Sequence, residues 1–223
     1  MLRGRGSAFV DHRSSGRRLI SPGRRIRVLV GGTGVGKTEV LRALGQHGEP
    51  VLDLEEIAQH RGSAFGGIGS RAQPSQRQFA EAIALALDGA GRLWLEHEGP
   101  YLGQVALPRE LVVAMSRAPA VELFDDPVSR IERLHALYEG VGDSQLVEAI
   151  ERMRPRLPVE RAQGAVRAIL GGDRRRAIRF LLPYYDRAYF HQQRARAGRL
   201  TATVRVSGHS PWQIANTLLR IAP

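Results

Sequence analysis

The apolar positions form short continuous runs that alternate with stretches of helical spacing. The short runs predict strands at 25–30, 50–54, 92–96, 119–124 and 201–207. Apolar residues three and four positions apart predict helices at 37–48, 74–89, 108–118, 127–140 and 210–221, with a single helical turn at 55–60. Strands that alternate with helices indicate the α/β class, a mostly parallel sheet with helices on both faces.

The remaining segments divide the chain into four expected parts. Residues 143–171 predict two helices separated near 154–158, and 173–197 predict a basic helical stretch that is kinked or broken at Pro183. We therefore expect a basic flexible arm at 1–24, an α/β core at 25–142, a basic helical region at 143–199, and a closing strand and helix of the core at 200–223.

The charge is strongly positive and unevenly spread. The net charge is +11, and the segment 151–199 holds 13 Arg against four acidic residues. Such an excess favours a polyanionic partner, because bound phosphates release counterions. The alternative is a solvated, arginine-rich surface with no ligand.

Composition excludes several classes of site and predicts a location. There is no Cys, which rules out disulfides, thiolate metal sites and a cysteine nucleophile within these 223 residues. No apolar run reaches the length of about 18 residues needed to span a membrane. The basic start lacks the apolar segment of a secretory signal, so we expect a cytoplasmic protein without membrane contact.

The segment GGTGVGKT fits the phosphate-loop pattern G-x-x-x-x-G-K-[ST] and lies between a predicted strand and a predicted helix. Backbone N–H groups of such a loop and the positive end of the helix dipole bind phosphate oxygens. Lys37 is the only lysine among 33 basic residues, which fits a position that requires a compact ammonium. The predicted phosphate-binding residues are Gly31, Gly32, Thr33, Gly34, Val35, Gly36, Lys37 and Thr38.

Two acidic residues end predicted strands near this loop. Asp53 ends the second strand and Glu96 the third, so both are expected at the carboxyl edge of the sheet. With Lys37 they are the candidate catalytic residues. Thr38 and Glu96 are the candidate ligands of Mg²⁺. One of the two acids is alternatively a helix cap; Glu98 has a weaker claim, and His97 is expected to point away from the site.

Four further segments carry a family resemblance. They are VLDLEEIAQHRGSAFG, QPSQRQF, LWLEHEGPYLGQVALP and LLPYYDRAY. In this order they resemble landmarks of the P-loop domain of bacterial tRNA 2-selenouridine synthases, over about residues 28–206. The resemblance implies transfer of a geranyl group from geranyl diphosphate to 2-thiouridine at the tRNA wobble position. It also implies later replacement of that group by selenium from selenophosphate.

The chain departs from the family pattern in two respects. His97 stands where the family has Asp, and Leu102 where it has Ile. Family members usually carry an N-terminal rhodanese domain with a Cys used in the selenium step, whereas about 25 residues precede the first predicted strand here. We therefore expect that this chain alone does not complete selenation, and that a separate rhodanese-domain protein is a possible partner.

The resemblance also implies substrate-binding residues, namely Arg61, Gly62 and Ser63 of the HRGS block and Gln73, Ser75 and Gln76 of the QPSQ block. A guanidinium would fork onto a phosphate, and the Ser and Gln side chains would contact a base or a diphosphate. The alternative is that these side chains only rigidify their own loop.

The predicted tRNA-binding face lies in the basic helical region. It comprises Arg174, Arg175, Arg176, Arg179, Tyr184, Tyr185, Arg187 and Arg194, with arginines for the phosphate backbone and tyrosines for stacking on unpaired bases. Alternatively the tyrosines belong to the core. Two other functions stay open from the residues alone: a P-loop kinase of a small molecule or nucleotide, and an NTP-switched nucleic-acid-binding module. The diphosphate ligand is accordingly geranyl diphosphate or an NTP.

Overall fold

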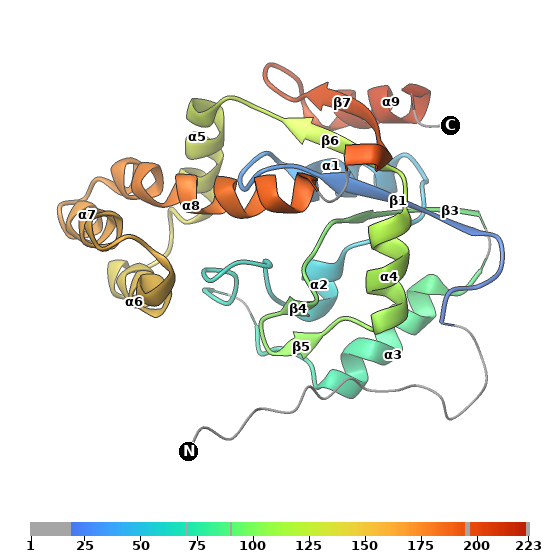
Figure 1. Cartoon of the computed structure of the whole chain (residues 1–223), viewed down its shortest axis with the longest axis horizontal. Coiled ribbons are helices and arrows are strands. Elements are labelled where there is room, and N and C mark those ends of the chain that lie inside the picture. The colour runs from blue at the N-terminus through green and yellow to red at the C-terminus, as the bar shows by residue number, and fades with distance from the viewer. Residues whose placement is uncertain (1–18, 70, 90, 195–196, 222–223) are drawn as a thin grey trace.

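A five-stranded parallel sheet forms the centre of the computed structural model, which describes residues 19–69, 71–89, 91–194 and 197–221 (Figure 1). The strand order is β2–β3–β1–β6–β7. Their bounds are Arg24–Val30 for β1, Val51–Leu52 for β2, Gly91–Glu96 for β3, Ala120–Phe124 for β6 and Leu200–Arg205 for β7. Since β1 pairs with β3 on one side and with β6 on the other, the loop after β1 lies where the strand order switches, the usual ligand position in such sheets.

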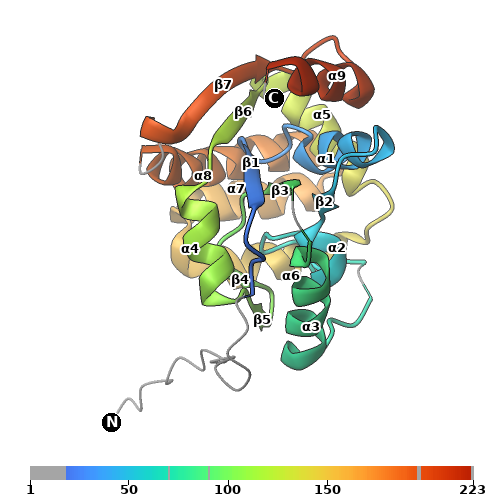
Figure 2. The ribbon, with the colours of Figure 1, turned by 90° about the vertical axis from the view of Figure 1, so that its right-hand side faces the viewer.

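Helices cover both faces of the sheet, as Figures 1 and 2 show. On one face lie α1 (Lys37–Gln46) and α9 (Pro211–Ile221). On the other lie α2 (Leu54–Ala58), α3 (Gln76–Leu87) and α4 (Arg109–Arg117). The predicted α/β class with a P-loop-type parallel sheet is thus confirmed.

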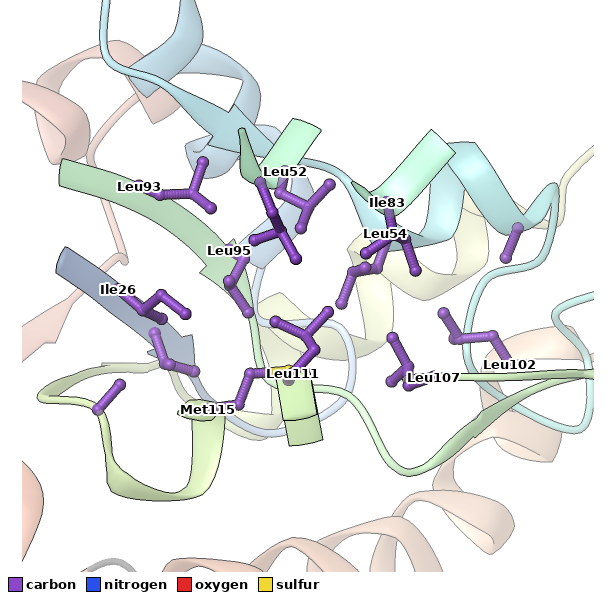
Figure 3. Packing of buried hydrophobic residues seen from close by; sticks show 14 of the residues in the cluster. Ile26, Leu52, Leu54, Ile83, Leu93, Leu95, Leu102, Leu107, Leu111 and Met115 are labelled. Carbon is purple, nitrogen blue, oxygen red and sulfur yellow. The ribbon is translucent and has the colours of Figure 1, made fainter. Parts of the chain in front are cut away.

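The alternation of side chains along β1 divides the core into two layers. Ile26, Val28 and Val30 pack in the layer of α3 and α4, whereas Leu29 packs in the layer of α1 and α9. Figure 3 shows part of the first layer, in which Ile83 of α3 and Leu111 of α4 lie over the strands. The central strands β1 and β3 are buried on both faces, which explains their continuous apolar runs.

The other helices form a second unit at the carboxyl end of the strands. They are α5 (Pro127–Leu137), α6 (Asp143–Met153), α7 (Val159–Leu170) and α8 (Arg174–Arg194), with a 3₁₀ turn at Arg154–Arg156 between α6 and α7. α7 packs on both α6 and α8, and α8 also packs on α5. None of the helices within the described ranges is both long and apolar enough to cross a membrane.

Of the two expectations for Pro183, a kink or a break, the break does not occur, since α8 is one helix from Arg174 to Arg194. Pro183 itself is exposed, and its neighbours Leu181 and Leu182 are buried in the apolar clusters against α7 and α5. Tertiary packing on both sides of the proline therefore holds the helix together despite the lost backbone hydrogen bond.

Other boundaries also differ from the sequence pattern. The second strand ends at Leu52 rather than at residue 54, because Asp53 caps α2. A small antiparallel hairpin of β4 (Tyr101–Leu102) and β5 (Val105–Ala106) was not predicted, since two-residue strands leave no periodicity to detect. A second 3₁₀ turn covers Ala197–Arg199. Most of the predicted arm, residues 1–18, lies outside the described residues.

The first prediction concerns the core between β3 and the helices. Leu95→Ala should lower the free energy of unfolding by about 2–5 kcal/mol, because the side chain is fully buried and leaves a cavity. Leu85→Ala on α3, where the leucine is 79 % exposed, is the control and should cost under about 0.5 kcal/mol. Urea unfolding followed by circular dichroism measures both, and equal losses would contradict the layer assignment.

Candidate phosphate-binding site

The loop between β1 and α1 has the backbone that the sequence motif requires. Gly34 and Gly36 have φ values of 78° and 94°, in the left-handed region that favours glycine. A Cβ on Gly31 would lie 2.5 Å from the carbonyl oxygen of Leu123 in β6. The loop therefore passes directly over the end of the sheet and opens at the amino end of α1.

Most of the loop faces one large cavity. Gly31, Thr33, Gly34, Gly36, Lys37 and Thr38 line it. The Lys37 ammonium donates to the Gly31 carbonyl oxygen over 3.1 Å, so the only lysine spans its own loop. The two other motif positions do not line the cavity: Val35 is buried in the core, and Gly32 faces α5.

Helix α5 packs directly on the loop. Arg130 Nε donates to the Thr33 carbonyl oxygen (2.8 Å), and Arg133 Nη1 donates to that of Gly34 (3.2 Å). A Cβ on Gly32 would lie 3.0 Å from Arg130 Nη2, and one on Gly34 would lie 2.8 Å from the side chain of Leu134. The motif allows any residue at positions 32 and 34, and glycine at both positions makes room for α5.

A buried ion pair connects the loop to α8. Arg130 Nη2 lies 2.5 Å from Asp186 Oδ1, and the two side chains are 9 % and 27 % exposed. One guanidinium thus bonds both the phosphate loop and the basic helix. Sequence reasoning missed Arg130, because its partners lie 97 and 56 residues away.

Three carboxylates line the cavity near Lys37. Glu96 ends β3, Glu98 follows it, and Glu55 lies in α2. Burial raises the pKa of Glu96, an effect that the Lys37 ammonium opposes. Burial and the neighbouring glutamates raise the pKa of Glu55 to about 8; burial likewise raises the pKa of Glu98 to about 7, against the Lys37 charge. The strand-end position predicted Glu96, whereas only the folded chain brings Glu55 beside it.

The predicted ligands Thr38 and Glu96 are compatible with bound Mg²⁺. Glu96 is 2 % exposed, and its Oε1 accepts no hydrogen bond among the described residues. The Thr38 hydroxyl lies 3.4 Å from Glu55 Oε2. No group of three or more His, Asp or Glu in the described ranges would hold a metal by itself. Such a site suits Mg²⁺, which keeps several waters and takes one or two protein ligands plus phosphate.

Asp53 lies close to the site but is engaged elsewhere. Its Oδ1 accepts from the Glu56 backbone N–H over 2.9 Å, which caps α2, and its Oδ2 accepts from Arg42 over 3.2 Å. This is the capping alternative raised for the strand-end acids. A catalytic role for Asp53 remains a prediction.

The HRGS block borders the cavity. Arg61, Gly62 and Ser63 all line it, and so does His97, which was expected to point away. Gly62 has φ 63°, and a Cβ there would lie 2.6 Å from Glu98 and 3.1 Å from Glu55. Glycine is therefore required where the two carboxylates approach the loop.

The QPSQ block has other contacts. The Gln73 amide donates to the carbonyls of Ala58 and Leu102, and Gln76 bonds both the N–H and the carbonyl of Ala106. Ser75 caps α3 in a capping box. None of these three residues lines the cavity, and their bonds match the rigidifying alternative. Their substrate role stays a prediction.

Among the described residues, only some of the arginines predicted to bind RNA are exposed without a protein partner that would compete with phosphate. Arg174 bonds backbone carbonyls between α5 and α6 together with Asp143, and Arg175 forks onto Glu132. Arg176, Arg179 and Arg187 are exposed. The side chain of Arg194 lies outside the described residues.

Tyr184 and Tyr185 of α8 are not exposed for stacking on RNA bases. Tyr184 and Tyr185 pack against the apolar cluster of α6, α7 and α8, and Tyr185 also lines the cavity. This favours the alternative that they belong to the core, although the cavity wall keeps one of them accessible to a ligand.

A parallel sheet with a phosphate loop at its switch point, followed by carboxylates at the strand ends, defines a P-loop α/β protein. Residues 24–213 match the family model described as the tRNA 2-selenouridine synthase AAA domain. The chain belongs to this family.

Curated relatives agree. The chain is 35 % identical to the tRNA 2-selenouridine synthase of Pseudomonas putida F1 over 209 residues, which are 78 % of this chain and 55 % of the relative. It is also 35 % identical to that of Azotobacter vinelandii, with the same shares covered. The chain thus spans about half the length of the curated relatives it matches.

Solved structures add little. A shikimate kinase from Acinetobacter baumannii is similar with a TM-score of 0.38 at 16 % identity, over 88 % of this chain and 92 % of that one. The fold class rests on the sheet and the loop described above.

The second prediction concerns the Arg130–Asp186 pair. Arg130→Gln should lower the free energy of unfolding by about 3–5 kcal/mol, because a carboxylate is left half-buried without its partner. Adding Asp186→Asn should restore part of the loss, so the two changes are not additive. The exposed pair Arg152–Glu148 is the control, with a coupling of about 0.5 kcal/mol or less. Additive losses in the Arg130–Asp186 cycle, measured by urea unfolding, would show that the pair carries no coupling.

The third prediction concerns pH. The raised pKa values of Glu55 and Glu98 mean that the folded state binds more protons than the unfolded state above pH 4.5. Their contribution to stability therefore falls as pH rises from about 5 to about 8. Glu98→Gln should flatten this part of the unfolding free-energy profile, whereas Glu148→Gln, at an exposed site, should not. Parallel profiles for the parent and Glu98→Gln would mean that Glu98 titrates normally.

Proposed function

We propose that the chain transfers a geranyl group from geranyl diphosphate to the sulfur of 2-thiouridine in tRNA. The observation that supports it most is one cavity of about 690 Å³ that the phosphate loop, the HRGS block and the strand-end carboxylates line together. Small-molecule sites have volumes of about 300–1,000 Å³. This cavity has room for more than a diphosphate.

The chemistry assigns roles to the lining residues. The C1–O bond of geranyl diphosphate breaks, a C1–S bond forms, and the N3–H proton of the base leaves. Lys37 and the loop N–H groups would stabilise the departing diphosphate, with Thr38 and Glu96 holding Mg²⁺, which supplies further positive charge. Glu98 lines the same cavity and is the candidate acceptor of the N3 proton. Arg61 is the candidate contact to a phosphate oxygen.

We further propose that the reaction of this chain alone ends at the geranylated nucleoside. The family resemblance implies a cysteine for the selenium step, and the chain has none. Selenophosphate would therefore be used only with a separate rhodanese-domain partner. Efficient 2-selenouridine formation by the purified chain would refute this.

The fourth prediction tests the proposed transfer. Purified chain, thiolated tRNA and geranyl diphosphate should yield S-geranyl-2-thiouridine, detected by mass spectrometry of the nucleosides. Lys37→Arg should lower the rate by about 100-fold or more, because a planar guanidinium does not replace the ammonium against the diphosphate. Arg77→Lys, at an exposed position of α3 outside the cavity, is the control. Transfer of phosphate from ATP to a metabolite, without any geranylated product, would instead identify a kinase.

The fifth prediction concerns tRNA binding by α8. Arg176, Arg179 and Arg187 changed together to Gln should weaken tRNA binding and reduce the slope of log affinity against log salt by up to about three. The same change at Arg77, Arg109 and Arg117, exposed on α3 and α4, is the charge-matched control. Affinities at several salt concentrations measure both. Equal slopes for the two triple variants would show that α8 is only a solvated surface.

A further inference from the structure

One wall of the cavity is apolar and comes from two helices. Each contributes residues spaced three and four positions apart, which lie on one helix face. They are Leu134 and Leu137 of α5 with Tyr138, which caps its end, and Tyr185, Ala188 and Tyr189 of α8. α5 also contributes Arg133, and the rest of the polar lining comes from other elements, chiefly 59–63 and 96–98.

The wall is preformed and begins at the phosphate loop. Ile131 and Leu134 of α5 pack against Leu182 of α8, and the Arg130–Asp186 ion pair joins the same two helices. Leu134 lies against Gly34 of the loop. Leu137 and Tyr138 lie about one helical turn further on, roughly 5 Å along α5.

The hydroxyls of the three tyrosines have neighbours within the protein, and that of Tyr138 lies beside Ser63 and Arg61, which also line the cavity. Tyr189 donates its hydroxyl proton to Glu122 over 2.7 Å, and the Tyr185 hydroxyl contacts Met153 Sδ at 3.3 Å. Leu137 remains 43 % exposed at the end of α5. The wall therefore offers a mainly apolar ligand surface whose hydroxyls already have neighbours within the protein.

We propose that this wall, which we call the α5–α8 wall, binds the hydrocarbon chain of a prenyl diphosphate while the diphosphate lies on the phosphate loop. The inference rests on the proposed function and adds the position of the chain and the residues that select it. Leu137 and Ala188 set the space beyond the first isoprene unit, so they determine which chain length is accepted. A nucleobase on the same wall would leave its polar edge without partners.

Binding of three ligands by the full chain tests this. The probes are inorganic diphosphate, dimethylallyl diphosphate and geranyl diphosphate, measured by titration calorimetry with Mg²⁺. Leu137→Asn should weaken geranyl diphosphate binding by about tenfold and leave inorganic diphosphate within about twofold. Leu170→Asn is the matched control, because Leu170 is also an exposed leucine at the last position of its helix, α7, outside the cavity.

Ala188→Trp is an independent variant that fills the wall with an apolar side chain at an exposed helix position. It should lower the affinity for geranyl diphosphate by about tenfold, and that for dimethylallyl diphosphate by less. Retained inorganic diphosphate binding verifies that each variant is folded. If Leu137→Asn no longer binds inorganic diphosphate, the Ala188→Trp variant alone tests the proposal.

The outcomes separate the inference from the proposed function. If the parent does not prefer geranyl diphosphate over inorganic diphosphate, the proposed function fails and the inference with it. If the parent prefers it and neither variant changes that preference, the α5–α8 wall is overturned while the proposed function stands. Weaker binding of a thiolated anticodon stem-loop, with unchanged prenyl binding, would likewise overturn the inference and assign the wall to a base.

Discussion

The guanidinium of Arg130 is the contact on which the site depends. It bonds the Thr33 carbonyl of the phosphate loop and the Asp186 carboxylate of α8, and it is almost fully buried. A buried charge needs both partners, because an unpaired one costs several kcal/mol. The loop and the basic helix are therefore held in one arrangement. Gly32 leaves room for the guanidinium, so the sequence of the loop itself reflects the presence of α5.

Local pattern was sufficient for most of the fold. The runs around β1, β3 and β6 are buried on both faces, and the phosphate loop follows β1 directly, so each signal lies within a few neighbouring residues. The errors come from contacts distant in sequence. Packing of Leu181 and Leu182 keeps α8 unbroken at Pro183. The β4–β5 hairpin is held by Gln73, which precedes α3, and by Gln76, the first residue of α3.

The candidate site divides in the same way. Lys37, Thr38 and Glu96 follow from a motif and a strand end, and they line the cavity together. No local sequence signal predicts Arg130, Glu55 or the α5–α8 wall. Their roles depend on contacts with residues that are distant in the sequence. The QPSQ block shows the converse: a distinctive sequence whose side chains bond the hairpin and cap α3 rather than lining the cavity.

The cavity does not share the excess positive charge of the chain. The net charge is +11, whereas five glutamates and five Lys or Arg side chains line the cavity among the described residues. A diphosphate entering beside ionised Glu55, Glu96 and Glu98 would be repelled by them, and the Lys37 ammonium and the arginines of the cavity would oppose that repulsion. Protons on these carboxylates or a divalent cation would lower the repulsion further. An excess of surface arginines favours a polyanionic partner, whereas the protonation of the buried carboxylates would determine how strongly the cavity binds a diphosphate.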